Sequence, residues 1–185
     1  MELQLRNAEA RDKAAIRDLI AESARGLSLG HYSPQQVEAA LQSCFGVDSQ
    51  LIADRTYFLA MDGDRMAGCG GWSFRETLFG SDREKYRNPQ PVDPVTGRAK
   101  IRAFFVQPDY ARMGVGSRIL QHCETEAWLK GFRNLELMAT LPGITFYTRY
   151  GYLPGATVVH TLENQVTIEF LHMTKHLFAD RFFVC

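Results

Sequence analysis

The chain has 185 residues, of which 45% are hydrophobic and 23% are charged. This length favours a single domain spanning 1–185, and no stretch is poor enough in apolar residues to predict disorder. Lysine plus arginine equals aspartate plus glutamate at 21 each. The chain therefore has no overall basic field that would attract nucleic acid or an anionic membrane, and we expect neither as a partner.

The start of the chain and its cysteines narrow the class of protein further. The sequence opens Met-Glu-Leu-Gln-Leu-Arg with no apolar run behind it, which indicates neither a signal peptide nor a spanning helix, so we expect a cytoplasmic protein. The four cysteines form no C-x-x-C pair: Cys44, Cys69, Cys123 and Cys185. His172 is followed by Met173, not by the glutamate of a metalloprotease motif. We expect no metal and no disulfide framework.

The first third of the chain predicts a strand followed by two helices. Residues 3–8 predict a strand, and apolar residues at helical spacing predict an amphipathic helix over 9–23. Ser33 and Gln36 have the spacing of a capping box, and Pro34 stands at the first helical position. We therefore expect a second helix to run from residue 34 to about residue 44.

A hairpin and a polar loop follow. Two runs rich in apolar and aromatic residues, 56–61 and 65–74, flank Asp62-Gly63-Asp64, where Asp-Gly supplies the positive φ angles of a tight turn. Residues 80–98 then carry three of the seven prolines among charged residues. This composition is too polar for a strand and predicts a surface loop, placed where it could cover a site.

The second half alternates between strand and helix patterns around a loop rich in glycine. A helix fits 115–130 and ends at Gly131, which suits the position after the last helical turn. A short helix over 144–150 ends at Gly151. The predicted strands of this half are 100–106, 134–139, 158–160 and 166–173.

The segment Tyr110–Ser117 lies between a predicted strand and a predicted helix. The first N–H groups of a helix have no internal partners and lie at the positive end of its dipole, so this geometry binds anions. Gly114 and Gly116 lack the Cβ atoms that would hold a phosphate away. A Rossmann fingerprint would need glycine where Ile119 stands, and the chain has no Gly-Lys-Ser/Thr. A strand-to-helix turn without a ligand remains the alternative.

Two segments resemble the GCN5-related N-acetyltransferase (GNAT) family. Residues 104–110 (Phe-Phe-Val-Gln-Pro-Asp-Tyr) lead into Arg112–Ser117 in the order and spacing of its central motif, Gln/Arg-x-x-Gly-x-Gly/Ala. The first motif position is Ala111, with Arg112 beside it. Downstream, 146–152 (Phe-Tyr-Thr-Arg-Tyr-Gly-Tyr) is similar to the Phe-Tyr-x-x-x-Gly-Phe signature. The resemblance covers about 3–177.

The resemblance implies a fold and a cofactor. The fold is α/β (α+β): one domain with a core at 3–177, whose central mixed, mostly antiparallel sheet of about seven strands carries about four helices on both faces. The cofactor is acetyl-CoA, and the reaction is transfer of its acetyl group to a primary amine of a small molecule or peptide by direct attack in a ternary complex. The cofactor-binding residues implied are Phe104, Phe105, Val106, Arg112, Met113, Gly114, Val115, Gly116 and Ser117.

The resemblance also implies catalytic roles. The N–H of Val106 polarises the thioester carbonyl, and Tyr147 protonates the leaving thiolate, although packing of its ring in the core is the alternative. Some relatives carry a glutamate early on the fourth strand, where this chain has Lys100. Glu136 is our candidate for the base that deprotonates the amine. Two further candidates are Glu76 and His31.

Several alternatives remain open at this point. A CoA-binding module that senses acyl-CoA without catalysis would keep the anion-binding loop. Cys69 with His31 or His160 would suit a thiol hydrolase, although the spacing does not support it. The cations Lys100, Arg102 and Arg75 suggest a substrate with a carboxylate. A homodimer stays open through an apolar surface of Trp72, Phe178, Phe182 and Phe183, for which core packing is the simpler explanation.

Overall fold

The computed structural model describes residues 2–84, 87–162 and 165–179, and within them one seven-stranded sheet in the order β1-β2-β3-β4-β5-β7-β6. Neighbouring strands are antiparallel except β4 and β5, which run parallel. The strands are β1 (Leu3–Asn7), β2 (Tyr57–Asp62), β3 (Arg65–Ser73), β4 (Ala99–Val106), β5 (Asn134–Thr140), β6 (Leu153–Thr161) and β7 (Thr167–His176). The predicted mixed, mostly antiparallel sheet is confirmed.

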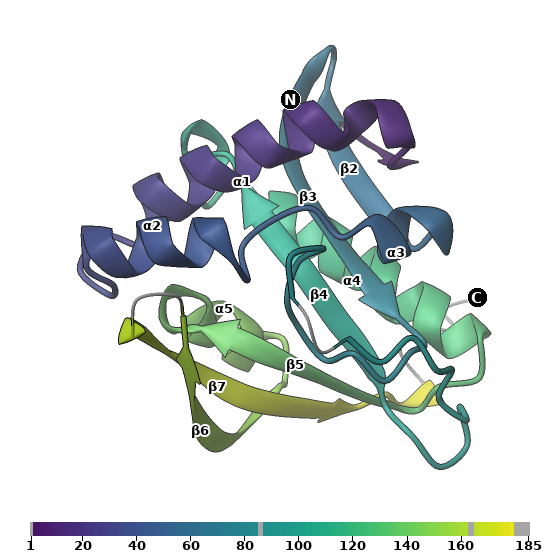
Figure 1. Cartoon of the computed structure of the whole chain (residues 1–185). Helices are drawn as coiled ribbons and strands as arrows, with labels where there is room; N and C mark the ends of the chain where they lie inside the picture. The colour runs from purple at the N-terminus through teal and green to yellow at the C-terminus, as the bar shows by residue number, and fades with distance from the viewer. Residues whose placement is uncertain (1, 85–86, 163–164, 180–185) are drawn as a thin grey trace.

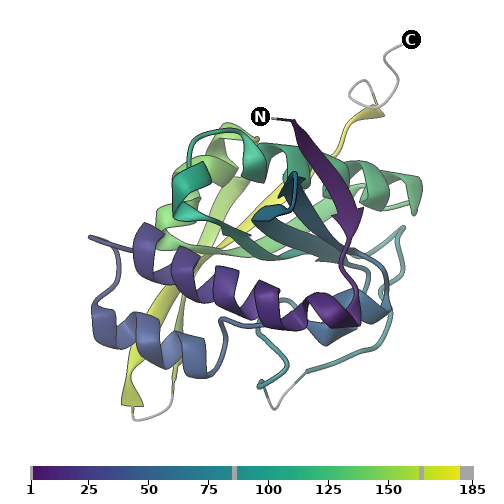
Figure 2. The ribbon, with the colours of Figure 1, turned by 90° about the horizontal axis from the view of Figure 1, so that it is seen from above.

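Helices cover both faces of this sheet (Figures 1 and 2). On one face α1, α2 and α3 pack over one apolar cluster, and on the other α4 and α5 pack over a second. The helices are α1 (Lys13–Leu27), α2 (Pro34–Gln42), α3 (Ser49–Ala53), α4 (Val115–Leu129) and α5 (Ile144–Arg149), with short 3-10 turns η1 (Ala10–Asp12), η2 (Pro108–Tyr110) and η3 (Leu141–Gly143). None of the helices in these described ranges is long and apolar enough to cross a membrane.

The boundary signals in the sequence differ in how well they match the structure. The capping box of α2 is confirmed, because Ser33 Oγ accepts from the Gln36 N–H at 3.2 Å and Gln36 Oε1 accepts from the Ser33 N–H at 2.9 Å. The first helix instead begins as the turn η1 and runs on to Leu27. β6 starts at Leu153, five residues before the predicted strand. The sequence did not predict these first residues because the side chains of β6 are mostly exposed and show no apolar alternation.

A bulge in β4 changes which side chains meet each face of the sheet. Across β3, Gly71 pairs with Arg102 but Cys69 pairs with Phe105, so β4 has one extra residue in this interval. Ala103 accommodates it with a φ of 55°. After the bulge, Phe104 packs with the α4 side and Phe105 with the α1 side.

The two parallel strands separate just before this bulge. β4 and β5 pair only at Ala99–Leu135 and Lys100–Glu136, near the beginning of both strands. Beyond these two pairs the strands diverge, and Figure 1 shows β4 and β5 opening away from one another. The divergence leaves one edge of β4 without a strand partner in the middle of the sheet, and this edge positions the candidate site.

Candidate active site

A cavity of about 80 Å³ lies where β4 and β5 diverge. Its lining comes from both faces of the sheet, from the diverging strands, from the linker between α2 and α3, and from the beginning of the long loop after β3. The lining residues are Cys44, Phe45, Gly46, Leu78, Phe79, Gly80, Ile101, Arg102, Ala103, Phe104, Phe105, Met138, Thr140, Tyr147 and Phe170. The predicted loop over 80–98 thus meets the cavity at its first residue.

The beginning of α4 presents a run of free backbone amides beside this opening. The first helical bond in the turn is from Arg118 N–H to Gly114 O, at 3.0 Å. The four consecutive N–H groups of 114–117, and that of Arg112, have no hydrogen-bond partner among the described residues. Four N–H groups at the positive end of a 15-residue helix form a site suited to a pyrophosphate.

Glycine is favoured at positions 114 and 116 for two different structural reasons. Gly114 is the N-cap of α4 with a φ of 85°, a left-handed conformation that glycine adopts without strain. A Cβ on Gly116 would lie 3.3 Å from the Phe146 ring and 3.8 Å from Val106 Cγ2. Gly116 therefore lets the first turn of α4 approach both α5 and the end of β4, which brings the anion-binding amides next to the diverging strands.

The edge of β4 presents alternate amides to the opening. The Gln107 N–H donates to Ala67 O of β3 at 2.9 Å, and alternation directs the Phe105 N–H to the same side. The amides of Phe104 and Val106 consequently face the opening. That of Val106 donates to the Ser23 hydroxyl of α1 at 3.2 Å, so Ser23 holds the amide that the resemblance assigned to the thioester carbonyl.

Tyr147, the predicted acid, lies in the wall of the cavity. Its ring lines the cavity and lies 6.3 Å, centroid to centroid, from the ring of Phe104. Its hydroxyl forms no hydrogen bond with any described residue. Burial, with a smaller effect from Cys123, raises the pKa of Tyr147 well above its usual range. The phenol therefore stays protonated and available as a donor, whereas a purely structural tyrosine normally satisfies its hydroxyl.

Glu136 lies outside the cavity lining, in a partly buried row of polar side chains across three strands. Its carboxylate contacts Lys100 Nζ of β4 at 2.7 Å and His172 Nε2 of β7 at 2.8 Å. Burial opposes ionisation, but the bonds from Lys100 and His172 outweigh it and lower the pKa of Glu136. The carboxylate is thus a weak base by itself. It does share a strand face with the cavity residue Met138, two positions further along β5.

The other candidates are less well placed. His31 and Glu76 are exposed and do not line the cavity. Cys69 is fully buried, its Sγ lies 3.3 Å from Tyr57 Oη, and burial raises its pKa to about 12. A nucleophilic cysteine needs an accessible thiol with a low pKa, so the thiol hydrolase interpretation has no structural support.

The apolar surface that left a homodimer open is not formed as the sequence suggested. Trp72 is 2% exposed in the core beneath α4, so it cannot form a surface patch, whereas Phe178 is 61% exposed. The other two aromatic residues of that set, Phe182 and Phe183, lie outside the described residues.

Sequence reasoning missed two further polar residues around the opening. Ser23 was assigned only to a helix face, and nothing in its neighbourhood signals a bond to a strand edge. Tyr32 is buried between α1 and α2, where its hydroxyl accepts from the Leu141 N–H at 2.9 Å and donates to Glu169 O at 2.6 Å. A tyrosine directly after Gly30-His31 in a polar turn is a signal that could have suggested an anchoring role.

The chain belongs to the GNAT acetyltransferase family, since the sequence pattern of the Acetyltransferase (GNAT) family matches residues 14–152. The family uses acetyl-CoA, and the pyrophosphate of this cofactor is the kind of anion that the amides of α4 suit. No curated protein sequence matches the chain significantly.

Solved structures share this fold at low sequence identity. A GCN5-related N-acetyltransferase from Rhodopseudomonas palustris is 20% identical with a TM-score of 0.69, covering 96% of this chain and 97% of that chain. The PaiA N-acetyltransferase from Thermoplasma acidophilum, in complex with coenzyme A, is 14% identical with a TM-score of 0.63 and covers 95% and 99%. A GNAT acetyltransferase from Brucella melitensis, in complex with acetyl-CoA, is 15% identical with a TM-score of 0.53 and covers 82% and 83%.

Proposed function

We propose that the chain transfers the acetyl group of acetyl-CoA to the amine of a small molecule or peptide by direct attack in a ternary complex. The observation that carries this proposal is the adjacency of two features. Free amides at 114–117 begin α4, and the cavity containing Tyr147 opens between β4 and β5 beside them. The amides suit a pyrophosphate, and the cavity suits the reacting atoms.

The backbone of the chain supplies the binding and polarising groups in this proposal. The amides of 112–117 hold the pyrophosphate, and the free edge of β4 at 104–106 runs beside the pantetheine arm. The Val106 N–H exchanges its bond with Ser23 for one with the thioester oxygen. An oriented N–H stabilises the negative charge that develops on that oxygen during attack.

The reaction needs two proton transfers, after which the Glu136–His172 pair returns its extra proton through water to the Tyr147 phenolate. The amine nitrogen forms a bond to the acetyl carbon as the C–S bond breaks. Tyr147 donates its proton to the departing sulfur, which has a thiol pKa of about 8.5. The proton lost by the amine passes through water to the Glu136–His172 pair. Here Glu136 orients His172 through Nε2, and the other ring nitrogen accepts.

A transfer assay tests this proposal. The purified protein is incubated with acetyl-CoA and a set of amines, while thiol release and acetylated products are followed together by mass spectrometry. We expect equal amounts of free CoA and acetylated amine, both strongly reduced in Tyr147→Phe. Binding of acetyl-CoA without transfer to any amine would contradict the proposal and favour a module that senses acyl-CoA.

The remaining expectations stay predictions. They are the single-domain organisation, the cytoplasmic location, the absence of nucleic-acid and membrane partners, and the homodimer that the sequence left open.

A further inference from the structure

Arg102 is a buried cation whose hydrogen-bonding capacity is only partly used. Its side chain is 2% exposed, and the residue lines the cavity at the opening of the sheet. Nη2 donates to Gly80 O at 2.9 Å and lies 2.7 Å from Asp48 Oδ2. Nε is buried without a hydrogen-bond partner, and Nη1 has none among the described residues. One nitrogen of the guanidinium therefore makes all the contacts.

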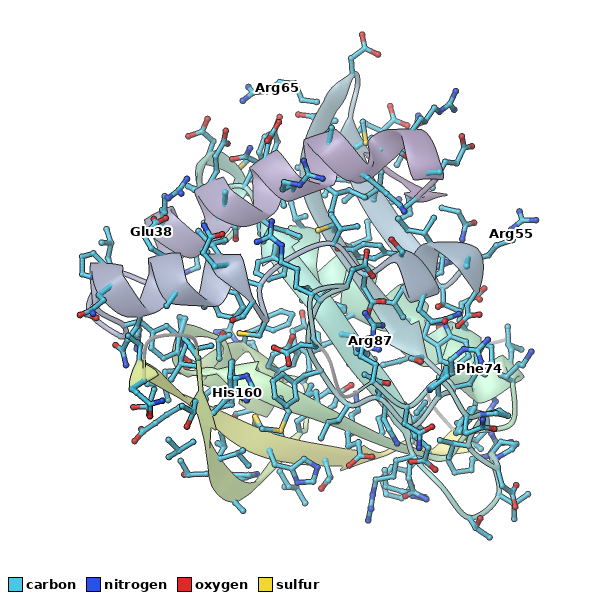
Figure 3. The ribbon with its side chains drawn as sticks, in the orientation of Figure 1. Glu38, Arg55, Arg65, Phe74, Arg87 and His160 are labelled. Carbon is cyan, nitrogen blue, oxygen red and sulfur yellow. The ribbon has the colours of Figure 1, made fainter. Side chains whose placement is uncertain are left out.

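The charge of Arg102 belongs to a small ionic cluster. Asp48, which is fully buried, lies 2.6 Å from Arg87 Nη2 as well, and Arg87 Nη1 lies 3.4 Å from Asp82 Oδ1, so two guanidinium groups share two carboxylates. Figure 3 labels Arg87 in front of β4, on the face that α3 covers. The contact from Arg102 to Asp48 is an ion pair without hydrogen-bond geometry, since Asp48 Oδ2 itself has no hydrogen-bond partner. Burial lowers the pKa of Arg102, and Asp48 opposes this effect.

The two other cations that suggested a carboxylate substrate are already occupied. Lys100 Nζ contacts Glu136 at 2.7 Å and donates to Arg98 O at 2.8 Å. Arg75 forms two hydrogen bonds with Asp54, at 2.6 and 2.7 Å. Of the described residues that line the cavity, Arg102 is the only one with a charged side chain. Buried polar groups are normally satisfied, so Arg102, although paired with Asp48, has hydrogen-bonding capacity left for a ligand.

The rest of the cavity limits what this partner can be. The lining is otherwise rich in aromatic and apolar side chains: Phe45, Phe79, Phe104, Phe105, Met138 and Phe170. Arg102 stands two residues before Phe104 on β4, with the bulge at Ala103 between them. Its guanidinium contacts Asp48 on the α3 side, Phe104 packs on the α4 side, and both residues line the cavity. The volume of about 80 Å³ admits roughly half a dozen water-sized groups. An anionic group at Arg102 and an amine near Tyr147 must therefore belong to one small molecule.

We propose that Arg102 binds the carboxylate of the acceptor, and that the acceptor is a free amino acid with a small apolar side chain. This inference rests on the proposed transfer reaction and names its substrate class. Arginine suits a planar carboxylate, and the apolar lining receives the side chain. A peptide does not meet these conditions, because its terminal amine and terminal carboxylate are too far apart to share the cavity.

Binding of matched product pairs tests the inference independently of catalysis. The probes are the N-acetyl derivatives of glycine and alanine, each as the carboxylate and as the uncharged carboxamide, titrated calorimetrically in the presence of CoA. We expect at least one carboxylate to bind at least tenfold more tightly than its carboxamide. The ratio should fall to about one in Arg102→Gln. The matched control Arg87→Gln removes a charge from the same Asp48 but not from the cavity, and should keep the ratio.

Each outcome has a definite meaning. Equal binding of carboxylate and carboxamide, no binding of either, or an equal effect of Arg87→Gln would overturn the inference. If Arg102→Gln does not bind CoA and so is misfolded, the comparison in the wild-type protein still decides. If the protein acetylates amines but shows no preference for those with a carboxylate, the proposed substrate class is wrong and the transfer reaction stands. Preferential binding of carboxylates without any acetyl transfer would instead remove the proposed function and leave the Arg102 site.

Discussion

The backbone N–H of Val106 donates a hydrogen bond of 3.2 Å to the hydroxyl of Ser23. This bond joins α1 to the free edge of β4 at the position where our account requires an amide to meet the thioester oxygen. In the proposed reaction, Ser23 is a stand-in acceptor that keeps a partly buried N–H satisfied until the thioester carbonyl replaces it.

Replacing the Ser23 hydroxyl should lower the stability of the free protein and raise its preference for acetyl-CoA over CoA. In Ser23→Ala the Val106 N–H loses its partner, so we expect the free energy of unfolding to fall by about 1–3 kcal/mol. Acetyl-CoA restores a partner through its thioester carbonyl, which CoA lacks. The affinity ratio of acetyl-CoA to CoA, measured calorimetrically, should rise severalfold. An unchanged ratio would place the thioester oxygen elsewhere.

The hydroxyl of Tyr147 should contribute to the chemical step alone. We expect Tyr147→Phe to lower kcat by about 10²-fold or more, with CoA affinity unchanged, because the ring and its packing remain. Tyr150→Phe is the matched control, since Tyr150 packs on the same Phe146 ring, 5.1 Å away, but does not line the cavity. Equal losses in the two variants would assign Tyr147 a structural role.

The row of Lys100, Glu136 and His172 should have separable structural and catalytic roles. Glu136→Leu leaves Lys100 buried without its carboxylate, which should cost about 3–5 kcal/mol of stability. The double variant Lys100→Met/Glu136→Leu removes both charges and should recover most of this loss. Because the orienting carboxylate is still missing, the stable double variant should retain a kcat at least tenfold below wild type. Full activity in it would show that the amine proton leaves by another route.

Buried thiols should make the protein sensitive to alkaline pH. Burial raises the pKa values of Cys44 and Cys69 from 9.0 to about 12. Above pH 9 the unfolded chain releases these protons while the folded chain keeps them, so stability is full below pH 9 and is lost between pH 9 and 12. Each thiol contributes a slope of about 1.4 kcal/mol per pH unit. Denaturant unfolding at pH 8 and 10.5 measures this loss of stability. Cys69→Ala should make its slope shallower by the contribution of one thiol, about 1.4 kcal/mol per pH unit.

Local signals in the sequence predicted those elements whose causes are local. The capping box of Ser33 and Gln36 lies within one turn and gave the start of α2 correctly. The glycine of the 62–64 turn and the loop before α4 likewise depend on φ angles that few other residues adopt. The short helix α3 was missed because its five residues are stabilised by the Asp48 cap and by contacts from distant arginines.

The features that shape the candidate site depend on contacts far apart in the chain. Nothing around Ala103 signals a bulge, because its positive φ is imposed by pairing with β3 and by the divergence from β5. The alternation that places Phe104 and Phe105 on opposite faces follows from that bulge. Likewise, the sequence presents Lys100 and Arg102 as two equivalent cations. In the fold both pair with a carboxylate, Glu136 and Asp48 respectively, but only Arg102 keeps a buried nitrogen, Nε, without a hydrogen bond.

The central claim is that the amides at the start of α4 bind the pyrophosphate of acetyl-CoA. Its most direct test is a calorimetric titration of CoA into the wild-type protein, Gly114→Asn and Gly114→Asp. Both substitutes tolerate the left-handed conformation at this position and have the same shape, so they differ only in charge. We predict that Gly114→Asp binds CoA at least tenfold more weakly than Gly114→Asn, because its carboxylate repels the phosphates. Equal affinities of the two variants would contradict the account and place the cofactor away from this helix.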